Sequence, residues 1–140
     1  MMACGVHKLV ADVALVAADE VLFVRYRDTS RYDRQAGWFL PDDLLDHLEH
    51  PDEGVRRIVR EQTGLAADDL RLAEIESFGD GAWHLVFHYV AVLDEPAPVD
   101  PRGNVAEATW FPLDELPPAS EVAHHGWGLE VLGRVLAAPG

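Results

Sequence analysis

Basic and aromatic side chains gather in one short stretch of the chain, between residues 25 and 38. The formal net charge is -14, so this is the one place where phosphate groups would be attracted, and neighbouring rings could stack on a base. The cations are Arg25, Arg27, Arg31 and Arg34, and the rings are Tyr26, Tyr32 and Trp38. Asp28 and Asp33 alternate with the arginines, so the segment could equally be a solvated loop, and both interpretations stay open.

A second candidate is the segment RRIVREQTGL, residues 56–65, which follows Pro51 and two acids and contains a glycine at its end. These signals predict a helix, and positions 58, 61 and 62 share one of its faces because they are three and four residues apart. Carboxylates on such a face could bind a divalent cation through oxygen. Here only Glu61 is a carboxylate, since Ile58 offers no oxygen and the amide of Gln62 is neutral.

Both segments fit one longer pattern. Trp38-Phe39-Leu40-Pro41, Glu49, Arg57, Glu61 and Gly64-Leu65 resemble the Nudix box, which is written G-x5-E-x7-R-E-U-x-E-E-x-G-U with U aliphatic. The alignment needs no gap, but Ile58 and Gln62 replace two glutamates, and Asp42-Asp43 stands where family members usually have Gly-Gly. An entry hairpin and the segment TWFPLDELP extend the resemblance over most of the chain.

The resemblance implies a hydrolase of a nucleoside diphosphate linked to another group. In the family, Mg2+ or Mn2+ neutralises the pyrophosphate and activates water. The expected catalytic residues are Glu61 and Arg57. The expected metal ligands are Glu49, Glu61 and Asp43, with Asp42 and Glu107 as further candidate carboxylates. The expected substrate contacts are Arg25, Arg27 and Trp38, because the resemblance puts this strand and loop near the substrate cleft.

Two functions of different class stay open. The first is a divalent-cation-dependent hydrolase in which the surviving carboxylates still hold the metal. The second is a catalytically silent relative that binds a nucleotide or a partner protein through the same cleft. Loss of two charged ligands together with the Gly-Gly turn favours weak or absent standard hydrolysis.

Purely structural roles are also open for the same residues. Arg57 and Glu61 are four residues apart and could form a surface ion pair, and Glu49 could cap the following helix. Ile58 widens an apolar stripe made with Val55 and Val59, which predicts that part of the ligand face is packed.

The elements that position these residues follow from periodicity and turn signals. A hairpin is predicted within residues 7–28, with a turn at Ala18-Asp19-Glu20, and then a loop over residues 28–36. Next come a brief strand at residues 38–40 and a helix from Pro51 to Gly64. Strands at 70–79 and 83–93 follow, joined by a turn at Gly79-Asp80-Gly81, and then a strand within 107–116. A terminal helix is predicted over residues 121–137. This order predicts one α/β domain, residues 1–140, with a mixed sheet covered by helices on both faces, a Nudix-like α/β/α sandwich.

Four histidines need separate treatment. His84 and His88 lie in a predicted strand and point to one side of it, which favours packed or hydrogen-bonded histidines over a zinc site. His124 and His125 lie in the predicted terminal helix, before Gly126-Trp127, and could reach the cleft from it, but adjacent helical residues diverge by about 100°.

Composition limits the partners. The net charge of -14 argues against binding to nucleic acid polymers or anionic lipid, and the apolar run from Val13 to Ala18 is too short to span a bilayer. The expected ligand is therefore a small nucleotide or diphosphate. Cys4 is the only cysteine, which excludes an intramolecular disulfide and favours a cytoplasmic location. The resemblance also allows a homodimer.

Overall fold

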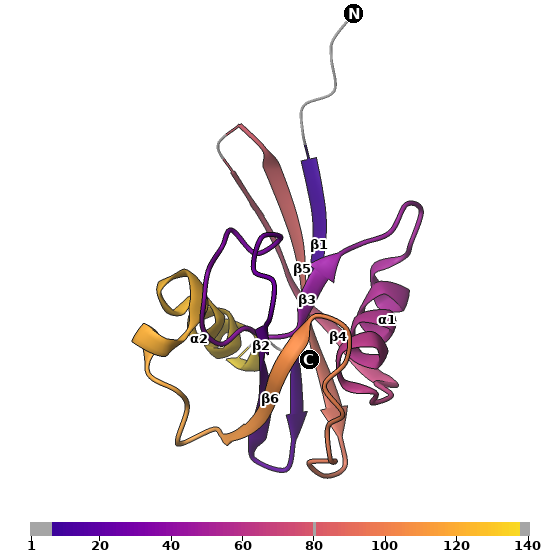
Figure 1. Cartoon of the computed structure of the whole chain (residues 1–140). Helices are drawn as coiled ribbons and strands as arrows, with labels where there is room; N and C mark the ends of the chain where they lie inside the picture. Colours follow the sequence, from indigo (N-terminus) through magenta and orange to yellow (C-terminus); the bar gives the residue numbers. More distant parts are fainter. Residues whose placement is uncertain (1–6, 80, 138–140) are drawn as a thin grey trace, which may run out of the picture.

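A central sheet with one long helix on each face makes up the fold (Figure 1). The computed structural model describes residues 7–79 and 81–137, so Cys4 and the predicted turn residue Asp80 lie outside the described part. The strands are β1 (His7–Ala17), β2 (Glu20–Tyr26), β3 (Asp42–Leu44), β4 (Asp69–Phe78), β5 (Trp83–Leu93) and β6 (Val105–Pro112). The helices are α1 (Pro51–Thr63), a short 3-10 turn (Ala119–Glu121) and α2 (Ala123–Ala137).

The sheet is mixed, as predicted. Its strand order is β4-β5-β1-β2-β6, and β3 pairs with β1 outside this path. β1 and β5 run parallel, from His7 opposite Trp83 to Ala17 opposite Leu93, whereas the other pairs are antiparallel. The predicted entry hairpin is the β1–β2 pair. The parallel register puts Lys8 beside His84 and Asp12 beside His88, on one face of the sheet.

Helix α1 covers the other face. Ala11, Val13 and Leu15 of β1 point toward it and pack against a stripe made of Val55, Ile58 and Val59. The helix begins where the His50 Nδ1 atom accepts a hydrogen bond from the Asp52 N–H at 3.0 Å, and it ends at Gly64, whose φ of 75° few other residues adopt readily. The predicted bounds of this helix are confirmed.

Helix α2 covers the face that carries Lys8 and His84. Val131, Leu132 and Val135 pack there on Ala14, Val21 and Val90, so helices cover both faces of the sheet, as predicted. The predicted start at residue 121 was too early. His124, His125 and Gly126 have positive φ angles of 54°, 56° and 86°, so regular helix begins only after this bend.

The segment before β3 also differs from prediction. Trp38 and Phe39 form only isolated bridges, to Val122 and Val24, and the three-residue strand β3 follows Pro41 instead of preceding it. The Pro41 carbonyl accepts a hydrogen bond from the Val13 N–H at 3.1 Å, which brings the next residues alongside β1. Among the described residues, none of the helices is both long and apolar enough to cross a bilayer.

Candidate active site

The carbonyl oxygen of Asp42, in the loop that the family pattern assigns to metal binding, accepts hydrogen bonds from the protein itself. Gln62 Nε2 donates to it at 2.9 Å and the Tyr32 hydroxyl at 3.3 Å. A carbonyl oxygen has two lone pairs, so these two donors satisfy it. The Tyr26 hydroxyl completes the arrangement, because it donates to Gln62 Oε1 at 3.0 Å and accepts from the Asp42 N–H at 3.1 Å.

The two tyrosines are suited to this role. Their rings stack in parallel, with centroids 3.9 Å apart. Burial, reinforced by the charge of Asp42, raises the pKa of both hydroxyl groups, so both keep their protons at neutral pH and remain donors. The loop is therefore fixed by neutral side chains.

The face of α1 that could carry metal ligands is largely occupied. Ile58 is 1% exposed and belongs to the core with Val55 and Val59, which confirms the packed stripe predicted from the sequence. Gln62 is buried and uses its amide on Tyr26 and Asp42. Glu61 alone presents a carboxylate on an exposed side chain, and one of its oxygens lies 3.3 Å from Arg57 Nη1.

Arg57 holds Glu49 through two parallel hydrogen bonds. Its Nε lies 2.9 Å from Glu49 Oε2, and its Nη2 lies 3.0 Å from Glu49 Oε1 and 2.9 Å from the Leu44 carbonyl. This bonding to Arg57 lowers the pKa of Glu49, so the carboxylate stays ionised. Glu49 also accepts from the Asp46 N–H at 3.0 Å, while His50 caps α1. The pair therefore fastens the loop before α1 to the helix.

Asp43 is likewise engaged. Its Oδ1 accepts from Arg31 Nη2 at 2.7 Å and from the Leu44 N–H at 2.8 Å, and its Oδ2 lies 4.0 Å from Arg57 Nη1. Glu49, Glu61 and Asp43 already accept hydrogen bonds from guanidinium groups, so a cation bound there would compete with Arg57 and Arg31. The donor set in this state does not fit a divalent cation held as the family pattern implies.

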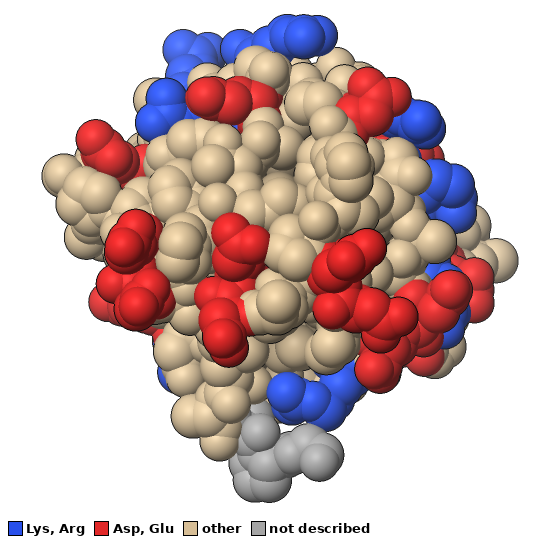
Figure 2. All heavy atoms as spheres, turned by 90° about the horizontal axis from the view of Figure 1, so that it is seen from below, with Lys and Arg blue, Asp and Glu red and all other residues tan. Residues whose placement is uncertain are grey.

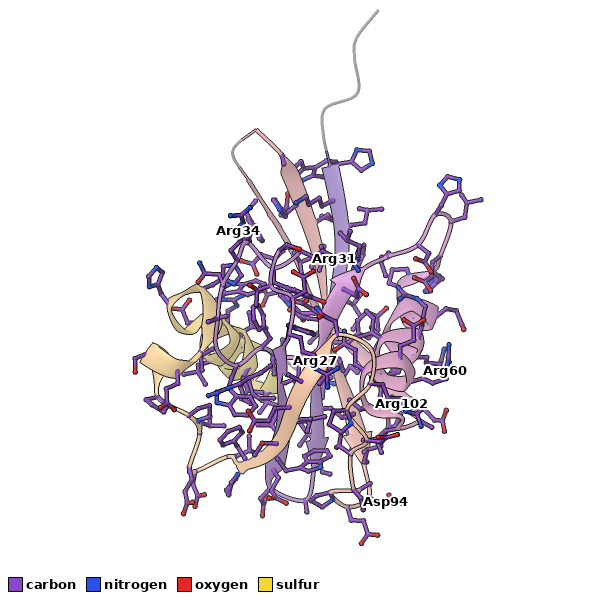
Figure 3. All side chains as sticks on the ribbon, in the orientation of Figure 1. Arg27, Arg31, Arg34, Arg60, Asp94 and Arg102 are labelled. Atoms are coloured by element: carbon purple, nitrogen blue, oxygen red, sulfur yellow. The ribbon has the colours of Figure 1, made fainter. Side chains whose placement is uncertain are left out.

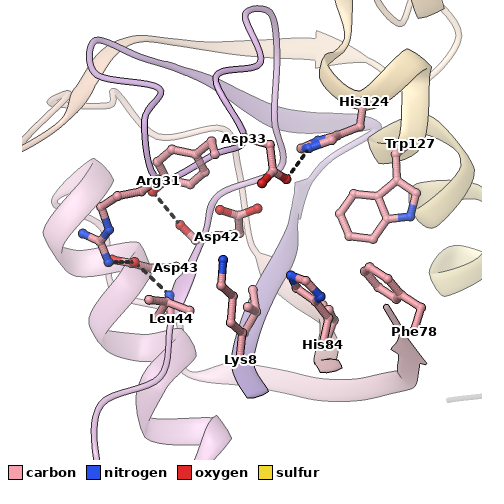
Figure 4. Close-up of a pocket in the computed structure, with 13 residues that line it drawn as sticks. Lys8, Arg31, Asp33, Asp42, Asp43, Leu44, Phe78, His84, His124 and Trp127 are labelled. Carbon is pink, nitrogen blue, oxygen red and sulfur yellow. Dashed lines mark hydrogen bonds and ion pairs between the residues drawn. The ribbon is translucent and has the colours of Figure 1, made fainter. Parts of the chain in front are cut away.

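A pocket of about 440 Å³ opens on the other side of β3 (Figure 4). Its floor comes from Lys8 and Val10 of β1 and from His84 and Val86 of β5. Its walls come from β3, from the loop that follows β2, from the end of β4 and from the start of α2: Arg31, Tyr32, Asp33, Asp42, Asp43, Leu44, Phe78, His124 and Trp127. The volume is within the range of small-molecule sites.

Three groups in this pocket lack protein partners among the described residues: the Asp42 carboxyl group and the Nδ1 atoms of His84 and His124. No hydrogen bond or ion pair reaches the Asp42 carboxyl group from the described residues, although the backbone of Asp42 is fully bonded. Desolvation, with the charges of Asp12 and Asp43, raises the pKa of this carboxyl group well above its usual range. The buried Nδ1 atom of His84 also has no partner in the described part of the chain.

The expected substrate contacts lie elsewhere. Arg25 stacks on Trp38, with its guanidinium carbon 4.2 Å from the ring centroid, and its Nε lies 3.7 Å from the Glu107 carboxylate. None of these residues lines the pocket, and neither does the exposed Arg27. Figure 3 shows Arg31 and Arg34 on the loop after β2, with Arg60 and Arg102 away on the α1 side. Of the basic and aromatic side chains of this stretch, Arg31 and Tyr32 line the pocket, and Asp33 lies beside them.

Six pocket residues were not expected from the sequence: Lys8, Val10, Leu44, Phe78, Val86 and Trp127. Strand alternation alone puts Lys8, Val10, His84 and Val86 on the inner face of their strands. It does not reveal that β1 and β5 are parallel neighbours, and this pairing is what brings the two sets together. Trp127 reaches the pocket because of the bend at residues 124–126.

His88 belongs to a buried charge network beneath α2. Its Nδ1 lies 2.7 Å from Asp12 and its Nε2 lies 2.7 Å from Glu76, as expected for a hydrogen-bonded histidine. Burial lowers the pKa of His88, but the bonds to Asp12 and Glu76 outweigh it and raise the pKa. Glu74, Glu76 and His88 have ligand atoms within 4.8 Å of one another, yet Arg134 donates to both glutamates at 3.1 Å and supplies the positive charge there.

Comparison with known proteins agrees with the fold described above. The family model described as NUDIX domain matches residues 6–129. A MutT NUDIX hydrolase from Burkholderia pseudomallei has a TM-score of 0.75 at 21% identity, over 92% of this chain and 98% of that one. The NUDIX domain of Shewanella oneidensis NrtR, complexed with ADP ribose, has a TM-score of 0.71 at 17% identity, over 97% and 91%.

A third structure contains the same fold as part of a larger protein. It is a bifunctional NMN adenylyltransferase/ADP ribose pyrophosphatase from Francisella tularensis, complexed with AMP and a Mn ion. Its TM-score is 0.73 at 13% identity, over 92% of this chain and 41% of that one. No curated protein matches the sequence.

Proposed function

Because the chain belongs to the NUDIX domain family, we propose that it binds a nucleotide or another organic diphosphate and that its standard metal-dependent hydrolysis is weak or absent. One observation carries the second half of this proposal. The Gln62 amide donates to the Asp42 carbonyl, so a neutral hydrogen bond stands where the family pattern calls for a carboxylate and a carbonyl that share a cation.

Ile58 supports the same conclusion. A cation ligand at this position would have to leave the core, because the side chain packs between β1 and the rest of α1. A glutamate at position 58, as in the family pattern, would place a carboxylate among apolar atoms, which is strongly unfavourable without a cation beside it. Positions 58 and 62, two of the three glutamate positions of the family pattern, therefore carry side chains that stabilise the fold.

Ligand binding is supported by the pocket and by the neighbouring structures. The pocket has the size of a small-molecule site, and two neighbours were crystallised with ADP ribose and with AMP. Figure 2 shows groups of Asp and Glu side chains scattered over the lower face among uncharged residues, with Lys and Arg near its edges. Such a surface repels a polyanion, so a small ligand suits the protein better than nucleic acid.

A compensated hydrolase is the second candidate, and one observation favours it. The three expected ligands Asp43, Glu49 and Glu61 lie within 4.0 Å of Arg57, as does Asp46, so carboxylates are already gathered around one cation. If Mg2+ or Mn2+ displaced the Arg57 contacts, these carboxylates would be the metal ligands, with Glu61 and Arg57 at the reaction centre. A cytoplasmic location and a homodimer remain predictions.

The test combines binding and turnover. We expect titration calorimetry to show that ADP ribose or a nucleoside diphosphate binds equally well in Mg2+ and in EDTA, and phosphate release assays to show no metal-dependent product. Rapid hydrolysis in Mg2+ or Mn2+ that Glu61→Gln abolishes would establish the compensated hydrolase instead. Absence of binding by any nucleotide or diphosphate would refute the binding function.

A further inference from the structure

The pocket beside β3 has an uneven distribution of charge and apolar surface. Lys8 and Arg31 are its cations, and both are exposed. Asp33, Asp42 and Asp43 are its acids, so acids outnumber lysine and arginine side chains along the lining. A doubly charged diphosphate placed deep in this pocket would face these acids, whereas at the exposed cations it would find opposite charge.

Two of the three acids are already satisfied. Asp43 accepts from Arg31, and Asp33 accepts from His124 Nε2 at 2.9 Å. The Asp42 carboxyl group is the one that points into the pocket without a partner among the described residues (Figure 4). A carboxyl group keeps an acceptor oxygen whether or not it is protonated, so a donor fits as the missing partner.

The opposite side of the pocket is aromatic and flat. The Phe78 and His84 rings stack with centroids 5.2 Å apart and planes 3° from parallel. The plane of the Trp127 ring lies at 71° to that of Phe78, with centroids 6.3 Å apart, so Trp127 packs edge-on beside this pair of rings. Val10 and Val86 complete an apolar floor. Such surfaces favour a planar ring over a sugar or a flexible chain, because rings stack on rings.

We propose that this pocket binds a planar nitrogen heterocycle that carries an amino group, with the amino group donating to Asp42 and the ring lying against Phe78, His84 and Trp127. Any phosphate attached to the heterocycle then lies toward Lys8 and Arg31 at the exposed side. This proposal deepens the proposed function and rests on it, because it names the part of the ligand that the pocket recognises.

Two nucleosides that differ by a single group test the proposal. Adenosine carries an exocyclic amino group, and purine riboside has the same ring and sugar without it. We expect adenosine to bind about 10-fold more tightly in EDTA, the factor that one hydrogen bond of about 1.4 kcal/mol gives. Asp42→Leu should reduce this ratio to about one, whereas Asp69→Leu, on the exposed first residue of β4, should leave it unchanged.

Trp127 provides an independent test of the aromatic side. Trp127→Leu should weaken adenosine binding by about 5- to 100-fold, the range for loss of one stacked base. Trp83→Leu is the matched control, because Trp83 is exposed and does not line the pocket. Circular dichroism and a thermal melt of each variant establish that a loss of binding is not a loss of fold.

The outcomes separate this proposal from the proposed function. Equal binding of the two nucleosides, or an unchanged ratio in Asp42→Leu, overturns the proposal. Binding of pyrophosphate or ribose 5-phosphate without any nucleoside binding also overturns it, yet leaves a diphosphate-binding protein. Selective binding of adenosine without any binding of ADP supports the heterocycle site and refutes the diphosphate function.

Discussion

The Gln62 side chain donates a hydrogen bond from Nε2 to the carbonyl oxygen of Asp42 over 2.9 Å, and its Oε1 accepts from Tyr26 over 3.0 Å. One amide thereby connects α1, β2 and the loop at β3. A carboxylate in its place could accept from Tyr26 but could not donate to Asp42. The amide is therefore one of two donors that hold the Asp42 carbonyl, beside the Tyr32 hydroxyl, and a carboxylate could not replace it.

Gln62→Glu should destabilise the fold, and the variant should be stabilised by added cations. Two oxygens would face each other where one hydrogen bond existed, at a cost of about 1–3 kcal/mol. We expect chemical denaturation to show this loss, and Mn2+ to restore part of it in the variant only. Gln35→Glu adds the same charge off the helix, and a similar Mn2+ response there would contradict the explanation.

Ile58→Glu should destabilise the protein by several kcal/mol, since it buries a carboxylate in the core beside Val55 and Val59. Ile58→Val removes only a methylene and should cost about 0.5–1.5 kcal/mol. Urea titrations of both variants measure the difference. Similar small losses for both would mean that position 58 has access to solvent.

Replacing Ile58 and Gln62 by glutamate together tests whether the altered helix face alone explains weak hydrolysis. If the variant folds with Mn2+ and cleaves a nucleoside diphosphate derivative, the face is the cause. If it folds and stays inactive, the loop and cleft have diverged as well, and Asp42-Asp43 becomes the next target.

Arg57→Lys should lower the free energy of unfolding by about 1–3 kcal/mol, because lysine cannot form the two-point contact with Glu49. Arg56→Lys is the control, since Arg56 makes a single contact with the exposed Glu53. The destabilisation caused by Arg57→Lys should be smaller at acid pH. Bonding to Arg57 lowers the Glu49 pKa, so this stabilisation is present above the ordinary value of about 4.3 and is lost as pH falls through the lowered one.

His88→Gln should cost more stability at pH 6 than at pH 8.5. The folded pKa of His88 is raised, so the contribution of the protonated ring is complete below the ordinary value of about 6.5 and disappears as pH rises through the folded value. Asp12 and Glu76 face the ring directly, and Arg134 bonds Glu76 behind them. His125→Gln, on an exposed residue, is the control variant.

The fold was largely predictable because its signals are local. Pro51 and the glycine after Thr63 delimit α1, and alternation separates the two faces of β1. Errors occurred where tertiary contacts overrode the pattern. Trp38 and Phe39 read as a strand but form single bridges, and residues 124–126 turn with positive φ before α2 becomes regular.

The site could be predicted from the sequence only where its residues lie in one continuous segment. Spacing identified the helix face and the Arg57 contacts with Glu61, because those residues share one helix. The pocket needs β1, β4, β5 and α2 together, and no local pattern brings Lys8 to His84 or Phe78 to Trp127. Residues 25–38 attracted attention through charge, yet Arg25 stacks on Trp38 and neither residue lines the pocket.

The most direct test of the central claim is a Mn2+ titration of the unmodified protein, followed by the EPR signal of free Mn2+ and repeated on Glu61→Gln. The claim that α1 presents no complete metal site predicts no bound Mn2+ at stoichiometric concentrations and superimposable curves for the two proteins. A single tight site in the unmodified protein that Glu61→Gln removes would contradict it.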